Sequence, residues 1–242
     1  MELYFCPDYT RRCLDWAESH HCIHVMRHKI GDLIEVFDGK GSSWEAKIEK
    51  IENHQVFVSL LREIKEESPS KKPLLILIQS VLKNKAMHWL LQKVTEIGVD
   101  RIIPVISKRS LLALEERQQL KEKKWNEILV AAAKQCHRRK LPELFKISLL
   151  ADALKEGFPS SLKLVAFLGK EARSLKEVMQ CSSSRNVSSV VILIGPEGDF
   201  TGEEKNMVLN QGFIPVSLGN QVLRSETAAL FLASVINYEL KL

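Results

Sequence analysis

The sequence predicts an α/β protein in which a small all-β domain precedes a larger domain built on a parallel sheet. Three observations support this fold class. Residues 190–194 are five apolar residues in a row, mostly β-branched, and such a run is typical of a strand buried on both faces. From Leu74 onward, strand-like and helix-like segments alternate along the chain. Before Ser68, short strand-like runs are separated by turn sequences.

The front domain is expected to be a small barrel, all-β after a short irregular start. Residues 33–37 run into the turn sequence of residues 38–41, and apolar and polar residues then alternate over residues 44–48. A further strand at residues 56–58 follows a turn-like sequence at residues 52–54. Strands this short and this closely spaced favour a barrel.

A charged, proline-bounded stretch at residues 62–73 is typical of a linker, so we expect domains at residues 1–68 and 73–242. The strands of the second domain are expected to start near Leu74, Arg101, Leu144, Leu162, Val190 and Phe213. Its helices are expected at residues 86–97, 115–135, 152–156, 171–180, 202–210 and 228–240. This alternation predicts a parallel sheet with helices on both faces, and ordinary connection rules predict a chain without a knot.

The composition is that of an ordinary globular protein of 242 residues, with 45% apolar and 27% charged residues. The formal net charge of +5 favours a polyanionic partner. The five cysteines are odd in number and include no CxxC pair, so we expect reduced thiols in a cytoplasmic protein. The sequence shows neither a signal peptide nor an apolar run of membrane-spanning length, and we expect no membrane partner.

Two glycine-rich loops are the strongest candidates for a functional site. The first, residues 195–202, follows the buried strand, and Thr201 with Glu204 forms a capping-box signature for the next helix. The second, residues 219–221, follows the next strand. Because open α/β sheets bind small molecules at the carboxyl ends of their strands, we expect a ligand pocket between these loops. Two tight turns without a ligand would explain the same glycines.

Other ligand motifs are missing from the sequence. It contains no GxGxxG or GxxxxGK[ST] phosphate loop, no GxSxG nucleophile elbow and no HExxH helix. The histidines of residues 20–24, with Cys6 and Cys13 nearby, match no standard zinc spacing, so we expect no metal. A basic, RNA-facing hairpin edge at residues 27–29 is the preferred interpretation of this region.

The sequence GPEGDFT, followed by LG and VLRSETA, resembles the C-terminal S-adenosylmethionine site of the SPOUT methyltransferases. It is most similar to the bacterial 16S rRNA (uracil N3)-methyltransferase family. Residues 21–48 resemble the PUA-like RNA-binding barrel of that family, and residues 91–110 resemble its middle segment. The resemblance implies a SPOUT α/β domain with a C-terminal trefoil knot. It also implies a homodimer formed through the apolar last helix, S-adenosyl-L-methionine as cofactor, and 16S rRNA or the small ribosomal subunit as partner.

The resemblance further implies a set of cofactor-binding residues in three loops at one edge of the sheet. Backbone groups of these loops are expected to hold the adenosine and methionine parts of the cofactor. The expected set is Leu168, Gly169, Ile194, Gly195, Pro196, Glu197, Gly198, Leu218, Gly219, Val222, Leu223, Thr227 and Ala228.

Three charged residues beside these loops are the expected catalytic groups. Uracil N3 carries a proton and attacks a methyl group only after that proton leaves, so a base or a cation that stabilises the uracil anion is needed. Arg224 is the expected cation, Glu226 is expected to orient it or to act as base, and Glu197 is a second candidate base. A structural ion pair between Arg224 and Glu226 is the alternative.

A basic run at residues 134–140 is expected to neutralise phosphates, although a solvated helix end is an equal explanation. The expected RNA-binding residues are Arg27, Lys29, Arg109, Arg138 and Arg139. Four residues, Lys134, Cys136, His137 and Asp199, depart from the pattern of the family, which usually has an acidic residue, serine, a small residue and glycine at these places.

The leading hypothesis is methylation of uridine N3 in 16S rRNA. The open alternatives are a SPOUT methyltransferase acting on tRNA or 23S rRNA, and a non-catalytic RNA-binding or ribosome-assembly factor.

Overall fold

A computed structural model of the chain describes residues 1–64, 72–110, 118–156, 158–159, 161–167, 169, 171–180 and 187–240, with the backbone alone at residues 118–120. Contacts divide the chain into two compact units. The first comprises Met1–Ser70 with Val130–Leu141, and the second comprises Lys71–Leu129 with Pro142–Leu242. The expected domains at residues 1–68 and 73–242 stay a prediction.

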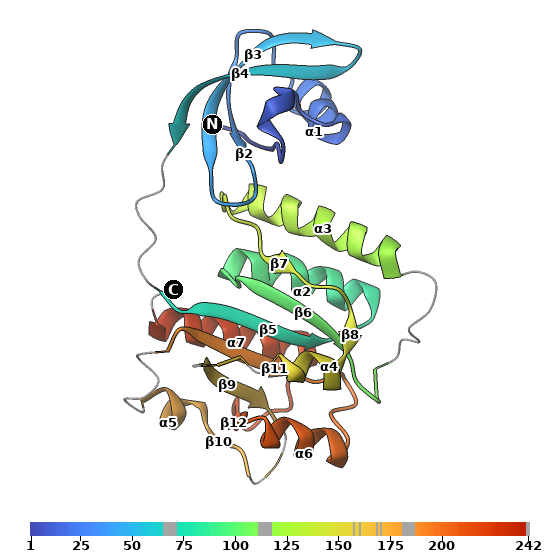
Figure 1. Ribbon diagram of the computed structural model, residues 1–242, viewed down its shortest axis with the longest axis vertical. Helices are drawn as coiled ribbons and strands as arrows, with labels where there is room; N and C mark the ends of the chain where they lie inside the picture. The colour runs from blue at the N-terminus through green and yellow to red at the C-terminus, as the bar shows by residue number, and fades with distance from the viewer. Residues whose placement is uncertain are drawn as a thin grey trace. The chain divides into compact units, whose positions relative to one another are not determined.

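The first unit contains a four-stranded sheet in the order β1-β2-β3-β4 (Figure 1). The strands are β1 (Leu3–Phe5), β2 (Leu33–Phe37), β3 (Ser43–Glu52) and β4 (Gln55–Ile64). β1 runs parallel to β2, and the other neighbours are antiparallel. Asn53 and His54 join β3 to β4 with φ angles of 50° and 61°, the left-handed geometry of a two-residue hairpin turn. The predicted turn at residues 52–54 is therefore confirmed.

The expectation that the front domain is all-β is wrong between residues 9 and 25, which are largely helical. The segments are a 3₁₀ turn η1 (Tyr9–Arg11), an α-helix α1 (Trp16–His20) and a π-helix η2 (His21–Val25). Asp15 caps α1, because its carboxylate accepts the Glu18 N–H at 2.8 Å. Ser19 is fully buried, and its hydroxyl donates to the Leu14 carbonyl and accepts the Val56 N–H. A side-chain cap and one buried face therefore favour a helix here.

The expected linker is also partly wrong. Arg62, Glu63 and Ile64, which the charge pattern placed in the linker, form the end of β4. Residues 65–71 of that stretch lie outside the described residues. Because β4 pairs with β3 over its whole length, backbone pairing extends further than the side-chain composition indicates.

Val130–Leu141 is tied to the first unit by polar contacts. Lys134 Nζ lies 2.7 Å from the Glu18 carboxylate, and Arg139 Nε donates to Glu35 at 2.6 Å. The Leu141 N–H donates to the Gly39 carbonyl at 2.8 Å. Gly39 has a φ angle of +76°, and a Cβ atom there would lie 2.9 Å from the Leu141 side chain, so this approach requires glycine.

The second unit is built on a parallel sheet in the order β10-β12-β9-β11-β5-β6-β7, with β8 paired to β6. Its strands are β5 (Leu74–Ser80), β6 (Arg101–Ile106), β7 (Glu143–Leu144), β8 (Ser148–Leu149), β9 (Ser161–Ala166), β10 (Arg173–Ser174), β11 (Ser189–Ile194) and β12 (Ile214–Ser217). Every pairing in this sheet is parallel. The predicted parallel α/β sheet is confirmed.

Helices cover both faces of this sheet (Figure 1). Besides α3 (Gln118–Gln135), which contributes to both units, they are α2 (Asn84–Ile97), α4 (Leu150–Lys155), α5 (Leu175–Gln180), α6 (Gly202–Asn210) and α7 (Ser225–Leu240). One core joins α2, α5, α7 and the first part of α3 to the face that carries Ile192, and the other joins α4 and α6 to the face that carries Val191. β11 is buried on both faces, as its apolar run predicts.

α7 is tied to the carboxyl ends of the two central strands. The hydroxyl of its first residue, Ser225, donates to the carbonyl of Gly195 at 2.5 Å, and the Gln79 amide donates to that hydroxyl at 3.0 Å. Buried apolar side chains then hold one side of α7 against α2 and the sheet. Within the described part of the chain, we find no helix that combines the length and the apolar content needed to cross a membrane.

Candidate functional site

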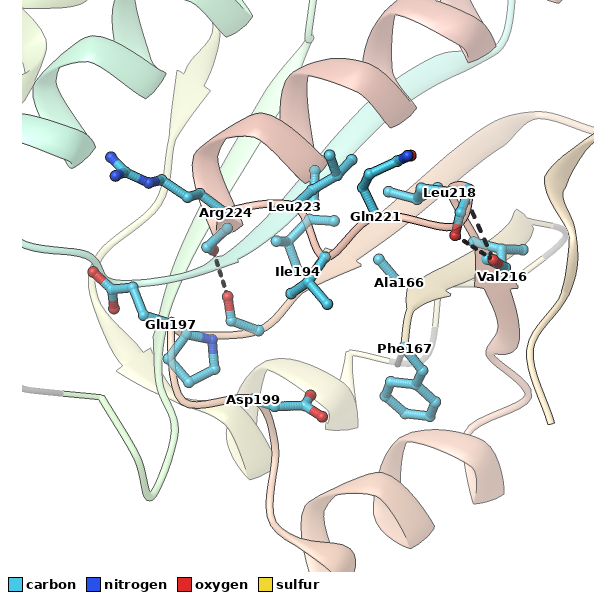
Figure 2. Close-up of a pocket in the computed structure, with 17 residues that line it drawn as sticks. Ala166, Phe167, Ile194, Glu197, Asp199, Val216, Leu218, Gln221, Leu223 and Arg224 are labelled. Carbon is cyan, nitrogen blue, oxygen red and sulfur yellow. Dashed lines mark hydrogen bonds between the residues drawn. The ribbon is translucent and has the colours of Figure 1, made fainter. Parts of the chain in front are cut away.

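A cavity of about 270 Å³ lies between the segments that follow β9, β11 and β12, at the sheet edge where the sequence predicts a ligand pocket. It is close to the lower end of the roughly 300–1,000 Å³ that small-molecule sites span. Its lining residues are Ala166, Phe167, Ile194, Gly195, Pro196, Glu197, Asp199, Val216, Ser217, Leu218, Gly219, Gln221, Val222, Leu223, Arg224, Ser225 and Ala228. Figure 2 shows these side chains around the opening.

The loop after β11 is fixed by its own backbone and by Phe200. The Asp199 N–H donates to the Pro196 carbonyl at 3.0 Å, which closes a tight turn. Phe200 is 2% exposed, and a Cβ atom at Gly195 would lie 3.1 Å from its ring. Glycine at position 195 therefore lets the loop pack on Phe200 without displacing it.

The predicted capping box at the start of α6 is confirmed and has a further partner. The Thr201 hydroxyl accepts the Glu204 N–H, and the Glu204 carboxylate accepts the Thr201 N–H at 2.9 Å. The same carboxylate accepts the Lys108 N–H at 2.7 Å, from the loop that follows β6. Beside it, the hydrogen bond and charge of the Glu203 carboxylate raise the pKa of Lys108, and Lys108 lowers the pKa of Glu203.

Arg109 contacts the loop that follows β11, because its guanidinium donates to the Gly198 carbonyl at 2.8 Å. Gly198 itself does not line the cavity. This contact places a predicted RNA-binding residue next to a loop that lines the cavity.

The loop before α7 keeps backbone groups available to a ligand. Gly219 has a φ angle of +129°, and the Ser217 hydroxyl donates to its carbonyl at 3.3 Å. Within the described residues, the N–H groups of Leu218 and Leu223 donate no hydrogen bond to the protein. Two backbone donors therefore remain unused next to the apolar side chains of this loop.

The charged side chains of the cavity lie in two places. Arg224 and Glu197 point to the same side, away from Leu218 (Figure 2). Asp199 is at the other place, with its carboxylate directed toward the Phe167 ring (Figure 2). Glu226 does not line the cavity, and no ion pair in the described part of the chain joins it to Arg224.

The cavity brings together most of the predicted cofactor-binding residues. Gly169 and Thr227 are described and, like Gly198, do not line it, whereas Leu168 lies outside the described residues. Sequence reasoning missed several lining residues, namely Ala166, Phe167, Asp199, Val216, Ser217, Gln221 and Ser225. Gln79 does not line the cavity, but it is fully buried, and its Oε1 atom has no hydrogen-bond partner among the described residues.

The predicted hairpin edge at residues 27–29 is wrong, because these residues follow η2 in a loop. Arg27 is exposed with a φ angle of 58°, and Lys29 is exposed as well. The Asp32 carboxylate accepts the Lys29 N–H at 2.9 Å and lies 3.1 Å from His28 Nδ1. The hydrogen bond from the Lys29 backbone, and to a smaller extent the one with His28, lower the pKa of Asp32.

The basic run at residues 134–140 is partly used inside the first unit. The side chains of Lys134 and Glu18 are 15% and 11% exposed, and those of Arg139 and Glu35 are 24% and 10% exposed. Arg138 is half-buried. The run therefore contains structural cations as well as candidates for phosphate contact.

His20 and His24, two of the histidines that raised the question of zinc, lie in a row of aromatic ring contacts. His20 stacks on Trp16 with ring centres 5.4 Å apart, and His24 lies 4.7 Å from His20 and 6.2 Å from His54. Among the described residues, no group of three or more histidines, cysteines or carboxylates is placed to hold a metal ion.

A parallel sheet whose strand-end loops surround one cavity defines the class of α/β proteins that bind a small molecule at the carboxyl edge of the sheet. Residues 69–237 match the RNA methyltransferase domain family, and residues 14–61 match the RNA methyltransferase PUA domain. The chain belongs to the RNA methyltransferase domain family, and within it to the group named ribosomal RNA small subunit methyltransferase E.

Three similar proteins illustrate this relationship. Ribosomal RNA small subunit methyltransferase E of Buchnera aphidicola subsp. Acyrthosiphon pisum is 30% identical, over 95% of this chain and 85% of its own length. A methyltransferase of Legionella pneumophila, solved with bound S-adenosylmethionine, is 29% identical with a TM-score of 0.87, covering 98% of this chain and 97% of that one. Ribosomal RNA small subunit methyltransferase E of Neisseria gonorrhoeae, also bound to S-adenosylmethionine, is 28% identical with the same TM-score and coverage.

Proposed function

We propose that this protein methylates N3 of a uridine in 16S rRNA of the small ribosomal subunit, with S-adenosyl-L-methionine as methyl donor. The observation that carries the proposal is the cavity at the carboxyl edge of the sheet, with Arg224 and Glu197 on one side of it. The family relationship supplies the reaction class and the ribosomal substrate.

The residues of the cavity fit the proposed donor. Apolar side chains such as Ile194, Val216 and Leu223 suit the flat adenine ring, and the unused N–H groups of Leu218 and Leu223 suit its ring nitrogens. When bound, the donor supplies an electrophilic methyl group on a sulfonium, so that the protein provides orientation and proton handling. We include Gly169, Gly198, Thr227 and the uncharacterised position Leu168 in the proposed binding set on the family resemblance alone.

The charged groups beside the cavity are proposed to activate the uridine. Arg224 stabilises negative charge that develops on a uracil oxygen as the N3 proton leaves. Glu197, on the same side of the cavity, accepts that proton, and Glu226 remains a second candidate that orients Arg224. A guanidinium and a carboxylate on one side of a cavity are suited to a substrate that loses a proton and becomes an anion.

We propose that a PUA-like domain at residues 1–68 binds the RNA and that the methyltransferase domain at residues 73–242 methylates it. Arg27 and Lys29 are exposed, and Arg138, Arg139 and Arg109 complete the proposed set. Their guanidinium and ammonium groups contact phosphates and so add affinity that depends on salt.

Three further features of the proposal rest on the family resemblance. They are a C-terminal trefoil knot, a homodimer and a cytoplasmic location. The contacts of Ser225 with Gly195 and Gln79 agree with the knot, because they hold the first residue of α7 at the ends of β11 and β5. Exposed Phe231 and Tyr238 on α7 support a dimer formed through that helix.

Methylation of ribosomes from a strain that lacks the protein tests the proposal. Purified protein and radiolabelled donor are added to small subunits, naked 16S rRNA, 23S rRNA and tRNA, and the modified nucleotide is mapped. We expect one N3-methyluridine in 16S rRNA. Label in 23S rRNA or tRNA alone would favour a different substrate. Absence of donor binding in calorimetry would favour a non-catalytic assembly factor.

A further inference from the structure

An ion pair at the edge of the cavity has no role in the proposed reaction. Asp199 lines the cavity, and its Oδ2 atom lies 2.6 Å from Nζ of Lys205 on α6. Both side chains are 29% exposed. Lys205 Nζ also lies 5.2 Å from the centre of the Phe167 ring, which forms another part of the cavity wall. The pair is therefore braced against the wall of the cavity.

Asp199 has a backbone conformation that favours glycine. Its φ angle is 59°, in the left-handed region where aspartate and asparagine are tolerated but glycine is favoured. The backbone closes the turn through the Asp199 N–H and the Pro196 carbonyl. Asp199 Oδ1 accepts the Phe200 N–H at 2.7 Å, and Oδ2 faces Lys205.

The chemistry of the pair selects one kind of ligand group. A carboxylate offers about four acceptor sites, and the contacts with Phe200 and Lys205 use two of them. Because Lys205 compensates the negative charge, the remaining sites suit a neutral hydroxyl better than an ammonium, which would meet repulsion from Lys205. Acidic side chains at this edge of nucleotide-binding α/β sheets accept ribose hydroxyls in the same way.

We propose that Asp199, held by Lys205, accepts a hydrogen bond from a ribose hydroxyl of the bound donor and makes the cavity specific for the ribose. The inference rests on the proposed function, since it requires that the cavity binds S-adenosylmethionine. It adds a specificity-determining side chain to a site otherwise expected to bind through backbone groups.

Calorimetry with three ligands tests the inference. S-adenosylmethionine, S-adenosylhomocysteine and 5′-methylthioadenosine share the same ribose. Only S-adenosylmethionine carries the methylated sulfonium, and 5′-methylthioadenosine lacks the amino acid. We expect Asp199→Gly to weaken all three by about tenfold, the range for a hydrogen bond to a charged acceptor. Glycine suits the φ angle, so this variant should fold, and its thermal melting curve checks that it does.

A deoxy series provides the direct readout. Removing the 2′ or 3′ hydroxyl from 5′-methylthioadenosine should weaken binding to the unaltered protein, and one of the two removals should cost nothing further in Asp199→Gly. Glu203→Ala is the matched control, because Glu203 is a neighbouring α6 carboxylate that pairs with Lys108 and does not line the cavity. It should bind all ligands as the unaltered protein does.

The other outcomes overturn the inference. A loss confined to S-adenosylmethionine would indicate contact with the sulfonium, and a loss that spares 5′-methylthioadenosine would indicate contact with the amino acid. Unchanged affinities in Asp199→Gly would show that the carboxylate does not contact the donor and only stabilises the turn. If the unaltered protein bound none of the ligands, the proposed function would fail first and this inference with it.

Discussion

Arg224 is the one positively charged side chain among the described residues that line the cavity, so the proposed stabilisation of a uracil anion depends on it. We expect Arg224→Ala to lower methyl transfer by about 100-fold or more, the range for losing one preorganised donor to a developing anion. Donor affinity, measured by calorimetry, should stay unchanged because the backbone of the loops holds the donor. Full activity in this variant would remove Arg224 from the mechanism.

Arg101→Ala is the matched control for that measurement. Arg101 begins β6 at the opposite edge of the sheet and forms an exposed ion pair with Glu143. Because exposed pairs of this kind contribute little, this variant should keep both activity and stability. Arg224→Lys keeps the charge but loses the planar fork, so partial activity is expected if charge alone is needed.

The loop that carries Arg27 and Lys29 is expected to depend on pH through Asp32. Hydrogen bonds from Lys29 and His28 lower the pKa of Asp32 in the folded protein. The carboxylate therefore stabilises the loop above the ordinary carboxyl pKa of about 4, and this contribution is lost as pH falls through the lowered pKa. The Lys29 amide resonance, followed by NMR during acid titration, should shift in this window. Asp32→Asn should abolish the shift, and a shift that persists in that variant would assign it to another group.

Single residues also show how far the sequence could predict the site. The Thr201 capping box is local in sequence, so the spacing of two residues was enough to place it. Gln79, Ser225 and Gly195 meet through hydrogen bonds that span up to 146 positions, and no local pattern records such a meeting. Asp199 departs from the family pattern in the sequence, but its place in the cavity wall depends on a left-handed φ angle and on the contact with Lys205, which no local pattern records.

At the scale of elements, hydrophobic patterns predicted where most strands lie, but they did not predict how far β3 and β4 extend, and they missed β1, β8 and β10. β11 was predicted because it is apolar at every position and buried on both faces. The helical stretch from α1 to η2 was missed, since its helicity depends on a cap at Asp15 and on burial against β4. Val130–Leu141 joins the first unit through Lys134 and Arg139, and charged residues in a basic run do not reveal which carboxylates they will meet.

Glu204 is expected to be the residue that couples α6 to the loop after β6. It is 5% exposed, and its carboxylate accepts N–H groups from both Thr201 and Lys108. We expect Glu204→Ala to lower the free energy of unfolding by about 2 to 3 kcal/mol, because buried donors lose a charged acceptor. Urea unfolding measures this change. Glu203→Ala, which removes an exposed pair with Lys108, should change it by less than about 0.5 kcal/mol, and equal losses in the two variants would contradict the coupling.

At the scale of the whole molecule, α7 buries one side in the second unit and leaves apolar side chains exposed on another. Ala229, Leu232 and Ile236 are fully buried in the second unit, whereas Phe231 is 44% and Tyr238 is 82% exposed. A shallow groove on the same helix includes Leu230 and Val235 as well. Exposed aromatic side chains next to an apolar groove are typical of a surface that another protein covers, and a second copy is the partner that the family resemblance implies.

We therefore expect Tyr238→Glu combined with Phe231→Glu to convert a dimer into a monomer, because two carboxylates would be buried without partners in the interface. Light scattering coupled to size-exclusion chromatography measures the mass. Leu61→Glu is the control, since Leu61 is 53% exposed on β4 in the first unit and lies far along the chain from α7. A monomeric unaltered protein would refute the homodimer, and a double variant that stays dimeric would place the interface elsewhere. If the dimer also completes the site, the monomeric variant should lose methyl transfer while its thermal melting curve shows that each chain remains folded.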